Sequence, residues 1–231
     1  MYTGPSIIRN GLVLALDAAN VKSYASGSTV WNDLSGNNLT GSLVNGPTFN
    51  STNGGSIVFD GSNDLVYIPV SINTGIDFTV ESTAKCNTMT TDGTNRQTVW
   101  SFNDGTNAGY QFLDFEVWGD SGRSFNGDGI NFTGPASIGS SIQSNNIHSY
   151  SLSCRSGIFY WYIDSNFITS YARTYSATSI YYKLASRGGG GATGGGQQWN
   201  GLIYNTRIYN RGLSATEILQ NYNATKARFG L

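Results

Sequence analysis

The chain has 231 residues, of which 39% are apolar and only 12% are charged, and its formal net charge is -1. This charged share is about half of what soluble domains usually carry, so Asn, Ser, Thr and Gly supply most of the polarity. The sequence contains no basic block, which excludes the electrostatic footprint of a nucleic-acid-binding protein and polybasic attraction to a membrane.

The N-terminal segment Met1–Asn10 lacks an apolar run behind a basic start, so we expect no secretory signal peptide. No stretch approaches the roughly 20 apolar residues of a membrane span, so we expect no membrane insertion. The length fits one large β-sandwich, and we expect a single domain over residues 1–231 that is made in the cytoplasm.

Short apolar-alternating runs recur along most of the chain, separated by clusters of Gly, Asn, Asp and Ser. Many short strands with turn signals between them predict a sandwich or barrel, and the absence of helical periodicity before residue 213 argues against parallel βαβ units. In chain order, the runs are Leu12–Leu16, Ile57–Phe59, Leu65–Ile68, Phe78–Val80, Thr98–Phe102, Tyr110–Trp118, Tyr150–Cys154, Phe159–Ile163, Ile180–Leu184 and Leu202–Tyr209.

The C-terminal segment differs, because residues 213–218 read as the start of a helix. Ser214 can cap the free backbone N–H groups, and Glu217 can bond back to the Ser214 amide. Leu213 and Ile218 occupy the positions of a hydrophobic staple. We expect one short helix with an apolar stripe of Ile218, Leu219 and Tyr222 that packs on the sheets.

Five stretches of the chain resemble the laminin-G-like, concanavalin A-like jelly-roll superfamily of lectins and glucanases. They are Gly11–Ala18, Trp31–Asn37, Ile57–Asp64, Phe78–Glu81, and Ile208–Ser214 with Glu217–Ile218. The opening Gly4–Ile8 and the ending Asn221–Phe229 are similar to the version found in phage virion proteins, including cyanophage-like ones. One departure is Ser82–Lys85, which stands where the family usually has a tryptophan-containing strand.

The resemblance implies an all-β fold, namely a two-sheet antiparallel jelly-roll β-sandwich closed by one short C-terminal helix. The superfamily contains lectins, adhesion modules, glycan hydrolases and inert structural domains. The fold therefore leaves the function open, and the residues of the site must decide it.

The strongest catalytic candidate is the pair Asp114 and Glu116. On a strand, these two carboxylates point to one face, about 6.6–6.8 Å apart, and paired carboxylates at such a separation can hydrolyse glycosides. Jelly-roll glucanases have a similar strand of alternating acids, but Trp118 stands where their next acid would be and Asp120 comes too late. We favour the alternative of a solvated outer face with no catalytic residues.

The turn containing Asp60, Asn63 and Asp64 is a tentative calcium site. With Asp17 or Asp77, these oxygen ligands could approach the six to eight that Ca²⁺ takes. The alternative is a tight hairpin turn, in which Asp, Gly and Asn supply the required backbone angles. We favour the turn and expect no other cofactor.

The remaining metal-ligating residues are sparse. His148 is the single histidine, so a zinc site or a serine triad lacks partners, and we expect His148 to begin a strand. Cys86 and Cys154 are too few for a disulfide framework, and two free thiols are favoured over a bridge.

Aromatic residues are abundant, and the structural core explains most of them. Tentative ligand-binding residues are Trp199, Tyr182 and Trp118, because aromatic side chains can stack on sugar rings or be buried in subunit contacts. Trp199 lies beside a glycine-rich loop at residues 188–196, and we expect it to be the exposed one.

Three functions follow from these observations. The first is a non-catalytic virion structural protein on the particle surface, a capsid decoration or a tail- or fibre-associated module. It would form a homo-oligomer, contact capsid or tail subunits and attach to host-surface glycans. The second is a calcium-assisted carbohydrate-binding module, and the third is a glycoside hydrolase. We favour the first, so we expect no enzymatic activity.

Overall fold

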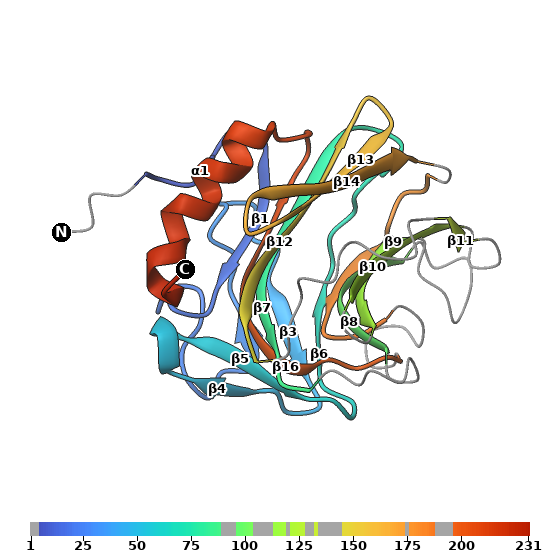
Figure 1. Ribbon diagram of the computed structural model, residues 1–231. Coiled ribbons are helices and arrows are strands. Elements are labelled where there is room, and N and C mark those ends of the chain that lie inside the picture. Colours follow the sequence, from blue (N-terminus) through green and yellow to red (C-terminus); the bar gives the residue numbers. More distant parts are fainter. Residues whose placement is uncertain are drawn as a thin grey trace.

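The computed structural model describes residues 5–88, 96–103, 113–118, 121–127, 132–133, 145–173, 176–187 and 196–231. These residues form two antiparallel sheets that face one another, with one helix on the outer side of the first sheet (Figure 1). The predicted all-β sandwich with a short C-terminal helix is therefore confirmed.

The first sheet, called sheet A, has the strand order β14-β13-β12-β7-β16-β5-β4, with β1 also paired to β16. Its strands are β1 (Leu12–Asp17), β4 (Thr48–Asn50), β5 (Ser56–Asp60), β7 (Phe78–Cys86), β12 (Ile147–Arg155), β13 (Ile158–Ile163), β14 (Asn166–Ala172) and β16 (Asn200–Tyr209). Strand β16 is central, because one half of its outer edge pairs with β5 and the other half with β1.

The second sheet, called sheet B, has the order β11-β10-β9-β8-β15-β6-β3-β2. Its strands are β2 (Val30–Trp31), β3 (Gly41–Val44), β6 (Leu65–Ile68), β8 (Arg96–Asn103), β9 (Leu113–Trp118), β10 (Ser121–Gly127), β11 (Phe132–Thr133) and β15 (Tyr181–Leu184). A short 3₁₀ turn, η1 (Thr52–Gly54), connects β4 and β5 of sheet A.

The core between the sheets consists of the inward-facing residues of both. Alternation along each strand sends every second side chain inward, which is why the apolar runs of the sequence become strands. Each of the ten predicted runs contains or overlaps a strand. Trp100 of sheet B stacks on Trp161 of sheet A, with ring centroids 6.0 Å apart and planes 11° apart. Cys86 and Cys154 are buried and free, as predicted.

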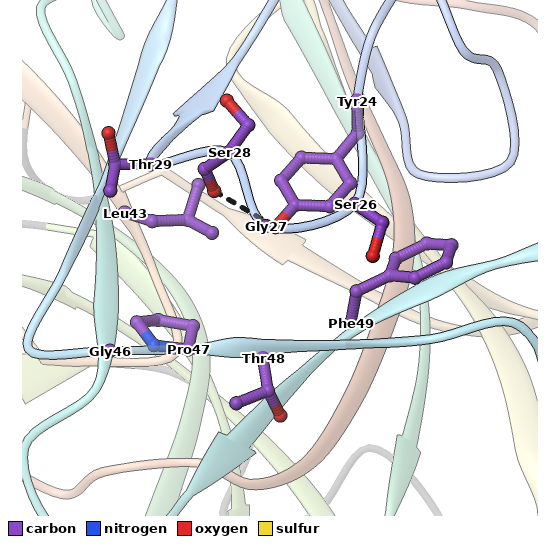
Figure 2. A pocket seen from close by; sticks show the side chains of 10 residues that line it. All are labelled: Tyr24, Ser26, Gly27, Ser28, Thr29, Leu43, Gly46, Pro47, Thr48 and Phe49. Carbon is purple, nitrogen blue, oxygen red and sulfur yellow. Dashed lines mark hydrogen bonds between the residues drawn. The ribbon is translucent and has the colours of Figure 1, made fainter.

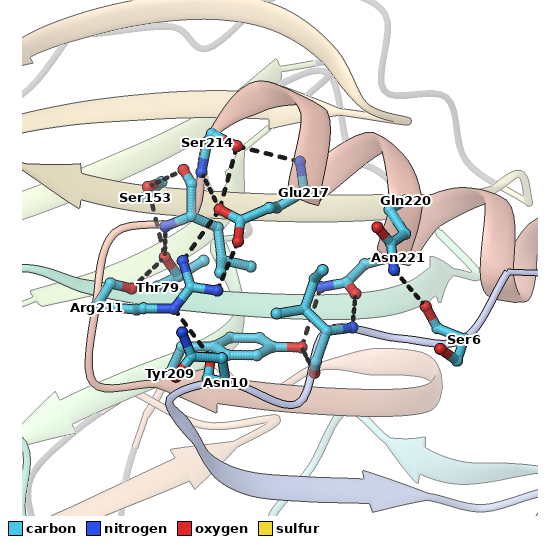
Figure 3. A network of polar contacts seen from close by, with 12 residues as sticks. Ser6, Asn10, Thr79, Ser153, Tyr209, Arg211, Ser214, Glu217, Gln220 and Asn221 are labelled. Carbon is cyan, nitrogen blue, oxygen red and sulfur yellow. Dashed lines mark hydrogen bonds and ion pairs between the residues drawn. The ribbon is translucent and has the colours of Figure 1, made fainter.

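The helix α1 (Ala215–Thr225) begins as the sequence predicts and continues into the 3₁₀ turn η2 (Lys226–Phe229). Ser214 accepts a hydrogen bond from the Glu217 backbone, and the Glu217 side chain accepts one from the Ser214 backbone (Figure 3). Leu213 and Ile218 are buried in one cluster, as a staple requires. Among the described residues, no helix is long and apolar enough to cross a membrane.

The predicted apolar stripe of α1 is wrong at one position. Leu219 is 45% exposed, whereas Ile218 and Asn221 are the buried residues of the helix. The reason is a buried charge beneath the helix. The Asn221 amide donates to the Glu81 carboxylate at 2.7 Å, so a polar residue occupies the inward position and the leucine faces outward.

Glu81 is the centre of this polar contact. Its carboxylate accepts hydrogen bonds from Ser151 on β12, Arg207 on β16 and Asn221 on α1. Burial raises the pKa of Glu81, and the positive charge of Arg207 opposes that rise. Asn221 also donates to the Tyr209 hydroxyl (Figure 3). One buried side chain thus connects three strands to the helix.

Replacing Asn221 with alanine should lower the free energy of unfolding by about 2 kcal/mol, because a buried carboxylate then loses a charge-assisted hydrogen bond. Urea titration measures this difference. The neighbouring Gln220→Ala is the matched control and should change stability by no more than about 0.5 kcal/mol, since the half-buried Gln220 contacts no buried charge among the described residues and donates to the Ser6 carbonyl. Equal effects of the two variants would contradict the central role of Asn221.

The helix start should also make stability depend on pH. The Arg211 guanidinium, with the Ser214 amide and hydroxyl, lowers the pKa of Glu217 from 4.5 to about 2. A lowered folded-state pKa contributes stability that is complete above the ordinary value and is lost as the pH falls towards 2. Glu217→Gln should therefore be less stable than the wild type by about 1 kcal/mol at pH 7. The difference should vanish near pH 2, which thermal unfolding across this pH range would check.

Candidate functional site

The carboxylate pair of β9 lies on the outer face of sheet B. Leu113, Phe115 and Val117 of this strand are in the core, so Asp114 and Glu116 between them share the opposite face, as predicted. The expected solvent exposure is wrong, since both acids are 0% exposed. Sequence alternation gives the face of a strand but not what covers that face.

Arg187 lies between the two carboxylates. Its Nε is 4.0 Å from the Asp114 Oδ2 and 3.8 Å from the Glu116 Oε1. The Gln197 amide, oriented with its nitrogen towards Glu116, donates to Glu116 and accepts from the Arg187 Nη1 at 3.0 Å. A backbone bridge between Arg187 and Gly196 places these side chains together. Residues 188–195 between them lie outside the described part of the chain.

A lysine adds a second cation to this face. Lys183 on β15 pairs with Ser101 on β8, which pairs with Asp114 on β9, so the three side chains form one row across the sheet. Lys183 is fully buried, and burial lowers its pKa from 10.5 to about 8. Its Nζ lies 5.2 Å from the centre of the Tyr181 ring. This face of sheet B therefore carries two cations, Lys183 and Arg187, and of these Arg187 lies within 4.0 Å of both acids.

The two acids therefore share one cation, Arg187, on a covered face. A glycoside hydrolase needs one carboxyl group that holds a proton and access for a sugar between its two acids. Here Arg187 lies within 4.0 Å of both carboxylates, and both acids are fully buried. Sequence reasoning missed Arg187 and Gln197, because the contact joins residues about 70 or more positions from β9, and no spacing motif marks it.

The aromatic residues proposed to bind ligand are mostly in the core. Trp199, expected to be exposed, is 0% exposed and belongs to the main core cluster. Tyr182 is also fully buried, and its hydroxyl is 3.0 Å from the Thr206 Oγ1 of the other sheet. Neither ring can therefore stack on a ligand in this structure. The side chain of Trp118 lies outside the described residues.

The turn from Asp60 to Asp64 has the bonds of a tight hairpin. The Asp60 amide donates to the Asp64 carboxylate at 3.1 Å, and the Ser62 amide donates to the Asp60 carboxylate at 2.8 Å. Gly61 has a φ of 80°, and the Asn63 carbonyl accepts from the Asn45 side chain. Calcium binding by Asp60, Asn63 and Asp64 stays a prediction.

The other proposed calcium ligands have partners of their own. Asp17 pairs with Arg228 at 2.7 Å, and Asp77 accepts from the Ser156 amide. Among the described residues, no group of three or more His, Cys, Asp or Glu side chains could hold a metal ion. His148 lies at the start of β12, as predicted, with its Nδ1 2.7 Å from the Asp164 carboxylate.

A neutral pocket of about 400 Å³ opens between the loop that precedes β2 and the segment that leads into β4 (Figure 2). Its aromatic wall is Tyr24 stacked on Phe49, with centroids 5.4 Å apart. The Tyr24 hydroxyl donates to the Ser28 carbonyl and holds the ring in place. None of the described residues that line this pocket is charged, so it suits a neutral ring.

Comparisons with known proteins identify the fold. No family model matches the chain, and no curated protein matches its sequence. Among solved structures, Trypanosoma rangeli sialidase in complex with sialic acid aligns with a TM-score of 0.66 and 15% identity. The binding domain of botulinum neurotoxin serotype D aligns with a TM-score of 0.69 and 14% identity. The receptor-binding domain of botulinum neurotoxin type G aligns with a TM-score of 0.68 and 17% identity.

These alignments cover 94%, 93% and 92% of this chain, in the same order, but only 33%, 52% and 51% of the other chains. The chain thus spans about a third of the sialidase and about half of the toxin binding domains. At these identities, the similarity establishes a shared fold, which agrees with the two-sheet antiparallel β-sandwich described above.

If Arg187 neutralises the acid pair, Arg187→Met should lower the free energy of unfolding by about 3 kcal/mol at pH 7, because it leaves buried carboxylates without their shared cation. The double variant Arg187→Met/Glu116→Gln should recover part of this loss. Arg173→Met is a control, since this arginine bonds the Thr74 carbonyl and has no carboxylate contact among the described residues. If the single and double variants lost the same free energy of unfolding, the result would argue against the ion pair.

Proposed function

We propose that this chain is a non-catalytic virion structural protein, a surface module that contacts capsid or tail subunits and attaches to host-surface glycans. The observation that carries the non-catalytic role is the state of the β9 acids. Asp114 and Glu116 are fully buried, and both lie within 4.0 Å of Arg187. Hydrolysis of a glycan would need both acids to be accessible, with one protonated and the other ionised.

The composition supports a role in close neutral contacts. Only 12% of the residues are charged, and several of these charges pair inside the protein, as Glu81 does with Arg207. The remaining surface is rich in amides and hydroxyls, which suit sugars and protein partners equally. The resemblance of the sequence to phage virion proteins favours a particle as the place where the module acts.

The open edges of the sheets support assembly with other subunits. Strand β14 ends sheet A, and its Phe167 is 56% exposed. An edge strand offers unpaired backbone groups to another chain, and exposed apolar side chains mark contact surfaces. We infer that the module forms a homo-oligomer or joins a neighbouring particle protein along such an edge.

Glycan attachment draws support from the structures with the same fold. One is a sialidase bound to sialic acid, and others are receptor-binding domains of neurotoxins. The pocket beside Tyr24 and Phe49 also has the size and polarity of a small-molecule site. We therefore assign the glycan role to surface hollows and not to the acid pair.

The test combines light scattering, a glycan array and a hydrolysis assay on the purified protein. We expect an oligomer or attachment to particles, binding to glycans, and no release of sugar from any bound glycan. Glu116→Gln, checked for folding, should bind as the wild type does. Hydrolysis of a β-glucan that disappears in Glu116→Gln would instead indicate a glycosidase. Calcium-dependent binding that Asp60→Asn removes would indicate the calcium-assisted lectin.

A further inference from the structure

A second hollow, here called the amide groove, lies on the outer face of sheet A and has a volume of about 530 Å³. Its floor is a row of directly paired residues from four adjacent strands. The row is Val58 on β5, Leu202 on β16, Lys85 on β7 and Ile147 on β12. Paired residues point to one face of a sheet, so these four side chains form a continuous strip.

The floor of the amide groove is mainly apolar and well supported. Leu202 packs in a cluster with Tyr204 and Phe229, and Val58 and Ile147 contact the same cluster. The Tyr204 and Phe229 rings meet edge to face, with centroids 4.9 Å apart. Such a surface offers a flat apolar patch to one face of a ligand ring without rearrangement of the fold.

The rim carries amides and one hydroxyl. The side chains are Asn50, Thr52, Asn53, Asn87 and Asn145. Some of their bonding capacity is used within the protein. The side-chain oxygen of Asn50 accepts a hydrogen bond from the Thr52 backbone amide. The side-chain nitrogen of Asn87 donates one to the side-chain oxygen of Asn200. An amide side chain has two donors and two lone pairs, so each keeps groups for a ligand rich in hydroxyls.

Lys85 is the charged residue of the amide groove. It is half-buried, and within the described chain it forms no ion pair. Arg228, whose charge acts on Tyr204 of the groove, is already paired with Asp17 at 2.7 Å. A lysine without a carboxylate partner at the floor of a polar groove favours a ligand that brings one negative group.

We propose that the amide groove binds an acidic saccharide, with the sugar carboxylate on Lys85 and the ring hydroxyls on the surrounding amides. This inference rests on the glycan attachment proposed above and names its surface and ligand class. A saccharide fits better than an acidic peptide, because the described residues of the groove include one cation but four asparagine side chains. An acidic saccharide has one carboxylate for the lysine and several hydroxyls for the amides. An acidic peptide would bring several carboxylates to a single lysine.

The test is a titration of the ¹⁵N-labelled protein with sialyllactose and with digalacturonic acid, using lactose as the neutral match. We expect the acidic sugars to shift the backbone signals of residues 50–58, 85–87 and 145–147, and to bind more tightly than lactose. Lys85→Met should weaken their binding about tenfold or more, the effect of losing one charge-assisted hydrogen bond. Asn145→Ala should weaken it as well, even if Lys85→Met proves unstable.

Two controls separate this inference from the broader proposal. Lys22→Met removes the same charge from an exposed loop and should leave the binding unchanged. Lys226→Met removes the charge of another half-buried lysine, whose Nζ lies 5.4 Å from the centre of the Tyr222 ring outside the groove, and should also leave it unchanged.

Unchanged binding of acidic sugars in both Lys85→Met and Asn145→Ala would overturn the inference. So would a preference for lactose, or tighter binding of an aspartate-rich peptide. In those cases glycan or particle attachment could still be measured, so the proposed function would stand. Absence of glycan binding together with absence of attachment to particles would overturn both.

Discussion

The packing of the helix on sheet A depends on the hydrogen bonds that stabilise the buried carboxylate of Glu81. Glu81 lies in the middle of the central strand β7, where an isolated charge would cost several kcal/mol. It is tolerated because Ser151, Arg207 and Asn221 reach it from two neighbouring strands and from the helix. This requirement places α1 against sheet A and turns Leu219 outward. The same Asn221 accepts from the Ile8 amide, so the N-terminal segment is held by the same network.

Sheet B repeats this arrangement with a different set of residues. Asp114 and Glu116 are buried on its outer face, and Arg187 lies within 4.0 Å of both. A chain with so few charges thus places several of them inside, where they position elements, and leaves a surface of amides and hydroxyls. That division is the reason why we propose the outer hollows, rather than the acid pair, as the recognition surfaces. Lys85, which has no ion pair among the described residues, is by contrast a half-buried cation in one of these hollows.

The sequence predicted the interior strands better than the edges. Every run with a buried face became a strand, because alternation of apolar residues reports contact with the core. The strands that no run predicted include β2, β4, β11 and β14, which end the two sheets. An edge strand has one neighbour and little apolar burial, so its sequence carries a weaker pattern. The capping box at Ser214 could be predicted because its hydrogen bonds join residues only three positions apart, Ser214 and Glu217.

The sequence by itself determined the fold class, the start of the helix and the shared face of Asp114 and Glu116. These features follow from periodicity and from contacts within a few residues. Only the tertiary structure decided that Arg187 joins the two acids, that Trp199 is buried, and that Lys85 lies among asparagine side chains. The physical reason is that a strand pattern gives the direction of a side chain. What meets that side chain depends on pairings between residues far apart in the chain.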